Sequence, residues 1–218
     1  MSSLGKMQSG IGIWLDELDE VKVSSDGQTA TIQGGTLSKE VIDALWNKGK
    51  QTGGCPSHDA NFSNSSCLST VTGACECTGF ISPGLGGGHG WLQGHHGLIS
   101  DQWTSVNIVT ADGELKTIDK SSDLWWAIGG AGHNFGIVTS ITSKVYDIEH
   151  RDWAHATYIF KGDKVKEIYE RINKYHLKNG TQPVGLVNWS YWMNLAMFDP
   201  TYVSLACGRH SSKITNRN

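Results

Sequence analysis

Short runs in which apolar and polar residues alternate predict β-strands in the first part of the chain. Residues 12–15, 21–23 and 29–33 have this pattern, and residues 25–27 (Ser-Asp-Gly) are typical of a turn between the last two runs. We therefore expect a small hairpin or meander that ends at the glycine pair 34–35.

A helical pattern follows this hairpin. Apolar residues recur at the spacing of one helix face, at Val41, Ile42, Leu45 and Trp46. Ser38 precedes them as a candidate N-cap, and Gly49 follows them as a stop. Strands followed by a helix indicate an α+β fold.

The middle of the chain begins with a stretch that has no period. Residues 53–70 are polar and aperiodic, which is typical of a loop or a disordered segment. Alternation returns over residues 103–119, around a turn at 111–113. A short helix is predicted over 121–127 and a strand over 137–146, so this part again combines strands with a helix.

A second domain is expected in the last third of the chain. Residues 156–160 predict a strand and residues 164–177 a helix, joined by a turn at 162–163. The tail after Ala206 is polar, and one strand and one helix cannot bury a domain core. We therefore expect this domain to be incomplete.

Composition disfavours several classes of function. The 218 residues include 18 basic and 21 acidic side chains, a net charge of −3, so the chain lacks the basic surface of a general nucleic-acid binder. No run reaches the roughly 18 apolar residues of a membrane span, and residues 1–13 lack the basic start and apolar centre of a secretory signal. We expect neither a nucleic-acid nor a membrane partner, and the cellular compartment stays open.

Glycine and cysteine are the informative residue types. The spacing of the five cysteines gives no disulfide framework, so we expect thiols, at least one of them with a specific role. Many of the 27 glycines fall within residues 73–97. Among them, residues 85–90 could cradle a phosphate, because residues without Cβ let several N–H groups approach one anion. The alternative is a glycine-rich turn in a β-region.

Several motifs in this region occur in a characteristic order. They are Cys75-Glu-Cys77-Thr-Gly79, Leu85-Gly-Gly-Gly-His-Gly90, Gln93-Gly-His-His-Gly-Leu98 with Asp101, and Gly130-Ala-Gly-His-Asn-Phe-Gly-Ile-Val-Thr139. Together they resemble the FAD-binding domain of the PCMH or vanillyl-alcohol-oxidase superfamily, and most of all its fungal berberine-bridge-enzyme-like oxidases. The resemblance runs from about Gly10 to Ser204. It implies an α+β fold of two subdomains that hold FAD between them, followed by an α/β substrate domain.

The resemblance also implies which residues bind FAD. Cys75 matches the thiol that many members bond to the flavin ring, because its offset to the glycine triplet agrees with the family, whereas that of Cys77 does not. A buried, unreactive thiol is the alternative for Cys75. The expected cofactor-binding residues are Cys75, Thr78, Gly79, Gly86, Gly87, Gly88, His89, Gly90, His96, Gly136, Ile137 and Val138.

The histidines of these motifs have different expected roles. His96 stands where the family often has Tyr or His near the flavin ring, whereas the side chains of His89 and His95 are expected to be structural or to face solvent. A zinc site is the rival interpretation, since these histidines and Cys75 and Cys77 are ligand types that zinc selects. Neither the Cys-x-Cys spacing nor the adjacent histidines fit a tetrahedral zinc module, so we expect no metal.

The chain departs from the family pattern in three places. Family members have a longer segment before the equivalent of Met7, which carries a histidine that bonds the flavin, so a histidyl link is expected to be absent here. Residues 53–70 look inserted, and the substrate domain of the family continues well beyond Ser204. The catalytic residues therefore stay unknown. The expected organisation is a remnant of the first FAD subdomain at 1–52, an inserted loop at 53–70, the second FAD subdomain at 71–150 and a truncated substrate domain at 151–218.

Two functions are compatible with these features. The first is an FAD-dependent oxidase that transfers hydride from a small-molecule substrate, an alcohol, a sugar or a secondary metabolite, to flavin, with oxygen as acceptor. The second is a non-catalytic, truncated fragment with weak or no FAD binding.

Overall fold

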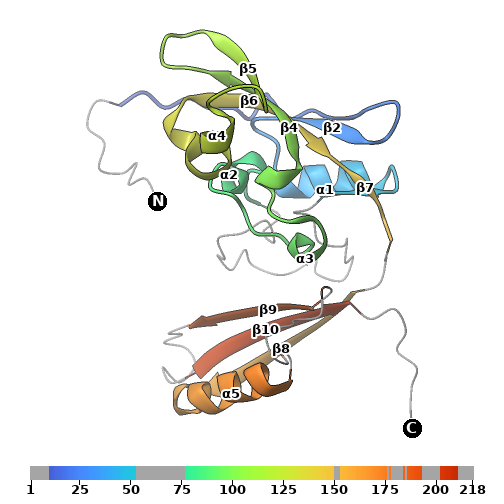
Figure 1. The fold of residues 1–218 in the computed structure, drawn as a ribbon, viewed down its shortest axis with the longest axis vertical. Helices are drawn as coiled ribbons and strands as arrows, with labels where there is room; N and C mark the ends of the chain where they lie inside the picture. Colours follow the sequence, from blue (N-terminus) through green and yellow to red (C-terminus); the bar gives the residue numbers. More distant parts are fainter. Residues whose placement is uncertain are drawn as a thin grey trace.

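The computed structural model describes residues 10–52, 77–149, 153–175, 177, 184, 186–192 and 202–210. Two antiparallel sheets dominate these residues, one of five strands in the glycine-rich part and one of three strands near the C-terminal end (Figure 1). Helices accompany both sheets, which confirms the expected α+β class. The expected insertion at 53–70 lies outside the described residues.

The five-stranded sheet joins distant parts of the chain. Its order is β1-β2-β6-β4-β5, and β6 pairs with both β2 and β4. Both predicted hairpins, 21–33 and 103–119, are confirmed. The strands are β1 (Val21–Val23), β2 (Thr29–Gln33), β4 (Trp103–Val109), β5 (Leu115–Asp119) and β6 (Ile137–Lys144).

The strand predicted over residues 12–15 is wrong. Leu15 begins a turn instead, in which its carbonyl accepts the N–H of Leu18 at 2.9 Å. The carbonyl of Leu18 in turn accepts the N–H of Gly35 at 2.8 Å. The backbone groups of this segment therefore bond within a turn and to Gly35, just after β2, and do not form a strand ladder.

Helix α1 (Ser38–Trp46) follows the first hairpin, as predicted, but its N-cap is Leu37 rather than Ser38. The hydroxyl of Ser38 donates to the carbonyl of Thr78 at 3.0 Å, a partner 40 residues away, so it does not cap the helix. The N–H of Leu37 donates to the Glu40 carboxylate at 2.7 Å. Gly49 has a left-handed φ of 70°, in agreement with its predicted role as the stop.

A short ribbon follows α1. Strand β3 (Lys50–Gln51) pairs antiparallel with β7 (Tyr146–Asp147), and Lys50 Nζ lies 2.6 Å from Asp147 Oδ1. The ribbon attaches the end of the predicted strand 137–146 to the segment after α1, so that Tyr146 lies outside the main sheet.

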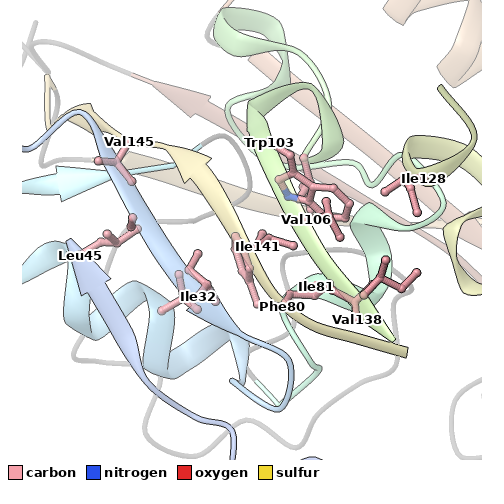
Figure 2. Packing of buried hydrophobic residues seen from close by; sticks show 14 of the residues in the cluster. Ile32, Leu45, Phe80, Ile81, Trp103, Val106, Ile128, Val138, Ile141 and Val145 are labelled. Carbon is pink, nitrogen blue, oxygen red and sulfur yellow. The ribbon is translucent and has the colours of Figure 1, made fainter. Parts of the chain in front are cut away.

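The core lies between the five-stranded sheet and its helices. Figure 2 shows Ile32 of β2 next to Ile141 of β6, with Leu45 of α1 on the β2 side of this cluster and Ile128 of α4 on the side of Trp103 and Val106 of β4. Each of these side chains is at most 2% exposed. Burial of alternate residues of β2, β4 and β6 on one face, and of one face of α1, explains why the apolar periodicity predicted these elements.

A second glycine cluster, residues 129–136, begins inside a helix. Helix α4 (Trp125–Ala131) includes Gly129 and Gly130, whereas the sequence predicted a helix over 121–127. Gly129 lies against Ser100: a Cβ at this position would meet Ser100 Oγ at 3.2 Å. Close packing between elements therefore outweighs the weak helix propensity of glycine here. The other short helices are α2 (Ile81–Gly84), α3 (Gln93–His96) and the 3₁₀ turns η2 (Ser100–Gln102) and η3 (Gly132–Asn134).

The three-stranded sheet has the order β8-β10-β9 and is antiparallel throughout. The predicted strand and helix of this region are confirmed as β8 and α5, whereas the polar tail after Ala206 was not predicted to form a strand. It does so because β10 lies between two partners, where its backbone groups pair on both sides. The elements are β8 (Trp153–Lys161), η4 (Gly162–Lys164), α5 (Val165–Tyr175), β9 (Leu186–Trp192) and β10 (Tyr202–His210). None of the helices described is long and apolar enough to cross a bilayer.

Replacement of Ile141 by alanine tests the position of the core. Ile141 is 1% exposed, and removal of its buried methyl groups is expected to lower the free energy of unfolding by about 2–5 kcal/mol. The matched control is Leu115→Ala on β5, where the side chain is 66% exposed and the change is expected to stay within about 0.5 kcal/mol. Urea unfolding followed by tryptophan fluorescence measures both, and equal losses would contradict the assignment of the core.

Candidate functional site

The fold brings the two glycine clusters together. The N–H of Gly132 donates to the carbonyl of Leu85 at 3.0 Å, which joins the second cluster to the loop that starts the first. A Cβ on Gly87 would lie 3.5 Å from the carbonyl oxygen of Gly129. Residues 85–88 and 129–132, more than 40 positions apart, therefore lie against each other.

The glycine triplet forms a turn that only glycine adopts readily. Gly87 and Gly88 have φ values of 93° and 75°, in the left-handed region. Their carbonyls accept the N–H groups of Ser100 and Ile99, each at 3.0 Å. A Cβ on Gly88 would also lie 2.9 Å from Ile99 Cδ1, so both the backbone conformation and the packing exclude a side chain there.

Three successive backbone donors follow this turn. Within the described part of the chain, the N–H groups of Gly88, His89 and Gly90 donate no hydrogen bond, although Gly90 is buried. Buried backbone N–H groups are nearly always paired in native proteins, so the buried Gly90 is the one of the three whose N–H is expected to find an acceptor outside the described residues. The arrangement fits a group that offers several oxygen acceptors, such as a diphosphate or the carbonyls of a heteroaromatic ring.

Thr78 and Gly79 lie against the N-terminal end of α1. The carbonyl of Thr78 accepts the backbone N–H and the hydroxyl of Ser38, and Gly79 forms an isolated bridge with Leu37. The structure thus joins these two predicted residues to the helix N-terminus, whereas Gly86 lies in the exposed part of the glycine loop.

Gly136, Ile137 and Val138 lie at the start of β6. Ile137 and Val138 pair with β4, beyond the last pair of β6 with β2 at Ser140. The Val138 side chain is 6% exposed and lies in the core (Figure 2), so only its backbone is available to a ligand. Gly136 needs to be glycine because a Cβ would lie 2.2 Å from the carbonyl oxygen of Val109.

His96 is held by aromatic stacking. Its ring lies parallel to that of Tyr146, with 3.8 Å between the ring centroids and 7° between the planes. Burial, together with the charge of neighbouring His95, lowers the pKa of His96 below its ordinary value, against a smaller opposing effect of Glu149. The imidazole is therefore neutral near pH 7 and can both donate and accept a hydrogen bond.

The side chains of His89 and His95 are exposed, as the sequence analysis expected. His89 Nδ1 lies 2.8 Å from Gln93 Oε1, a contact that ties the glycine loop to α3. Among the residues that the structure describes, no three His, Cys, Asp or Glu side chains gather as a metal site would require.

The cysteines are described only in part. Cys75, the expected thiol of a flavin bond, lies outside the described residues. Cys77 is disulfide-bonded, which corrects the expectation of thiols at this position. A disulfide forms where the fold brings two cysteine side chains within bonding distance, and spacing along the chain does not reveal this.

Sequence reasoning missed two side chains of the site, Tyr146 and Gln102. Tyr146 was predicted only as the end of an apolar strand, and nothing in its sequence context connects it to His96, 50 positions earlier. Gln102 directly follows Asp101 of the third motif, and this adjacency is the one signal that could have found it.

Comparison with known proteins finds relatives over most of the chain. A family model described as an FAD binding domain matches residues 1–119. FAD-linked oxidoreductase chyH of Penicillium rubens is 59% identical over 199 residues, which make up 91% of this chain and 36% of that protein. FAD-linked oxidoreductase chry5 of Gibberella zeae is 56% identical over 201 residues, 92% of this chain and 36% of that protein. The chain thus spans about a third of the length of these curated relatives.

A solved structure has a similar fold. The BBE-like 1 protein of Physcomitrella patens matches 92% of this chain and 38% of its own, with a TM-score of 0.70 and 21% sequence identity. At this identity the likeness concerns the fold alone.

Replacement of Gly88 by alanine tests the glycine turn. The matched control is Gly113→Ala. Gly113 also has a left-handed φ, of 81°, but an added Cβ there would meet no atom within 4 Å. Because only Gly88 adds a clash with Ile99, its replacement is expected to lower the free energy of unfolding by about 1–3 kcal/mol more than that of Gly113. Urea unfolding measures the difference, and similar losses in the two variants would argue against a tightly packed turn.

Proposed function

The chain belongs to the FAD binding domain family, and on this premise we propose that it is part of an FAD-dependent oxidoreductase that oxidises a small molecule. The observation that carries the proposal is the run of N–H groups at Gly88, His89 and Gly90 that donate to no acceptor within the described part of the chain. It lies directly after the left-handed glycine turn, in the motif that the family resemblance connects with the cofactor.

The residues of the site fit FAD. Its diphosphate and the carbonyls of its ring are the kind of acceptor that a row of backbone donors binds. Gly88, His89 and Gly90 would donate to such oxygens, and the neutral imidazole of His96 adds a side chain that can donate or accept. The backbones of Thr78, Gly79, Gly86, Gly136, Ile137 and Val138 complete the proposed cofactor-binding set, with Val138 limited to its backbone.

The proposed reaction is the oxidation of an alcohol, a sugar or a secondary metabolite, with oxygen as the final acceptor. Bound FAD supplies the capacity to accept a hydride from a substrate C–H bond. The residues described here bind and orient the cofactor, and the proposal assigns no catalytic base among them. The site residues therefore support the binding of FAD and do not select one of these substrates.

Cys75 is proposed to form a thioether with the flavin ring. The new C–S bond replaces the S–H bond of the thiol and a C–H bond of the ring, and oxygen takes the two electrons and two protons that are released. A covalent link raises the oxidising power of the flavin, which suits the oxidation of an unactivated alcohol.

The intact mass of the purified chain under denaturing conditions tests both proposals. After incubation with FAD in air, we expect a mass increase of one FAD less the hydrogens lost at the new bond. The increase should be absent from Cys75→Ala and retained in Cys207→Ala, the matched control that removes a cysteine from β10. Noncovalent binding is measured in parallel by the quenching of FAD fluorescence.

The outcomes separate the covalent link from the cofactor. Quenching without a mass increase would retain FAD binding and refute the thioether. A chain that neither quenches FAD fluorescence nor gains mass would support the alternative, a non-catalytic fragment with weak or no FAD binding.

A further inference from the structure

A unit of three side chains, His96, Gln102 and Tyr146, connects α3 with the rest of the fold. It joins α3, the turn η2 and the ribbon strand β7. Apart from His96, its members belong to none of the glycine motifs, and all three are buried or half-buried.

Gln102 is the centre of this unit. Gln102 is only 2% exposed. The nitrogen of its side-chain amide lies 2.6 Å from the carbonyl oxygen of His96 and 3.1 Å from that of Leu98. A carbonyl oxygen can only accept, so the NH₂ end of the amide faces these two carbonyls. Its oxygen therefore faces Tyr146.

The orientation of Gln102 determines that of Tyr146. The Tyr146 hydroxyl lies 2.7 Å from Gln102 Oε1, an atom that can only accept, so the hydroxyl donates. Burial raises the pKa of Tyr146 and keeps this proton in place. The phenol ring, fixed at its hydroxyl end and by the pairing of its backbone with Gln51, provides the surface on which His96 stacks.

The unit holds both the backbone and the ring of His96. Gln102 binds the carbonyl of His96, and Tyr146 covers one face of its imidazole. The segment that follows is tied to the glycine turn by the hydrogen bonds from Ile99 and Ser100 to Gly88 and Gly87. His96 is therefore held three residues before the segment that bonds the glycine turn.

We propose that Tyr146 and Gln102 are positioning residues that hold His96 as an uncharged hydrogen-bonding side chain at the edge of the FAD site. The inference rests on the proposed function for the identity of the ligand, but its geometry stands independently of it. An uncharged imidazole can accept a hydrogen bond as well as donate one, whereas an imidazolium can only donate.

Three groups near His96 affect its charge. His95 on α3 opposes protonation, Glu149 beyond β7 favours it, and the Tyr146 ring both excludes water and offers a π face to a cation. The proposal requires that the Tyr146 ring lowers the pKa of His96 by excluding water more than it raises that pKa by attracting an imidazolium to its π face. The two effects shift the pKa of His96 in opposite directions, so the effect of Tyr146 on that pKa decides between them.

The sign of the pH dependence follows from the lowered pKa of His96. The unfolded chain binds the proton more readily than the folded chain, so the stabilising contribution is fully present above the ordinary histidine pKa of about 6.5. It is lost as the pH falls through that value toward the lower pKa of the folded state. His96→Gln is expected to remove this part of the pH dependence of the melting temperature.

The first experiment follows the His96 Cε1 proton by NMR during a pH titration of the chain without FAD, with the signal assigned through His96→Gln. We expect a midpoint below about 6.5 in the parent chain and in Tyr146→Phe, which keeps the stacked ring. Tyr146→Leu removes the ring and is expected to raise the midpoint. An unshifted midpoint in the parent chain, or a lower one in Tyr146→Leu, would overturn the proposal.

The second experiment measures FAD affinity by fluorescence quenching at pH 7.5 and pH 5.5. The parent chain is expected to bind FAD more weakly at the lower pH, and His96→Gln to lose this dependence. Tyr146→Phe removes the hydrogen bond to Gln102 and is expected to weaken binding about two- to tenfold, the equivalent of one hydrogen bond. Tyr169→Phe on α5, where the side chain is 40% exposed, is the matched control and should bind FAD as the parent chain does.

The two experiments fail in different ways. If the chain binds no FAD at either pH, the proposed function is wrong and His96 has no cofactor to face, whatever its titration shows. If FAD binds with the same affinity at both pH values and in Tyr146→Phe, the proposed function stands and the positioning role is refuted.

Discussion

The left-handed turn at Gly87 and Gly88 is the constraint on which the rest of the site depends. It directs the two glycine carbonyls toward the N–H groups of Ser100 and Ile99, and the N–H groups of Gly88, His89 and Gly90 donate to no acceptor among the described residues. A side chain at Gly88 would need both a strained backbone and a displaced Ile99. The same turn therefore explains why glycine is required and why the segment after α3 returns to this point.

Helix α3 is a consequence of this constraint rather than an independent element. Four residues are too few for a helix to be stable by itself in water. Its position comes from the contacts around it: His89 with Gln93 at its start, and Gln102 and Tyr146 with His96 at its end. Both sets of contacts are only a few residues along the chain from groups of the glycine turn or its partners, Gly88 and Ile99.

The elements with a strong local signal were predictable. Both hairpins of the five-stranded sheet, α1, β8 and α5 follow from period and turn residues, because one face of each is apolar or its turn has favourable residues. Predictions failed where a distant partner decided the outcome. Ser38 bonds Thr78 instead of capping α1, and β10 is a strand because it lies between β8 and β9. Glycines 129 and 130 are helical within α4, where Gly129 packs against Ser100.

By itself, the sequence determined the α+β class, the order of the glycine motifs and the FAD-binding family, because local spacing and motif order carry this information. It also singled out His96 and the glycine loop as candidates. Only the tertiary structure decided which backbone donors are left unpaired and which side chains hold His96. The physical reason is that both depend on partners far away in the chain: Ile99 and Ser100 take the glycine carbonyls, and Tyr146 provides the stacked ring. A hydrogen bond or a stacked ring between distant segments exists only once the sheet and its ribbon have brought them together.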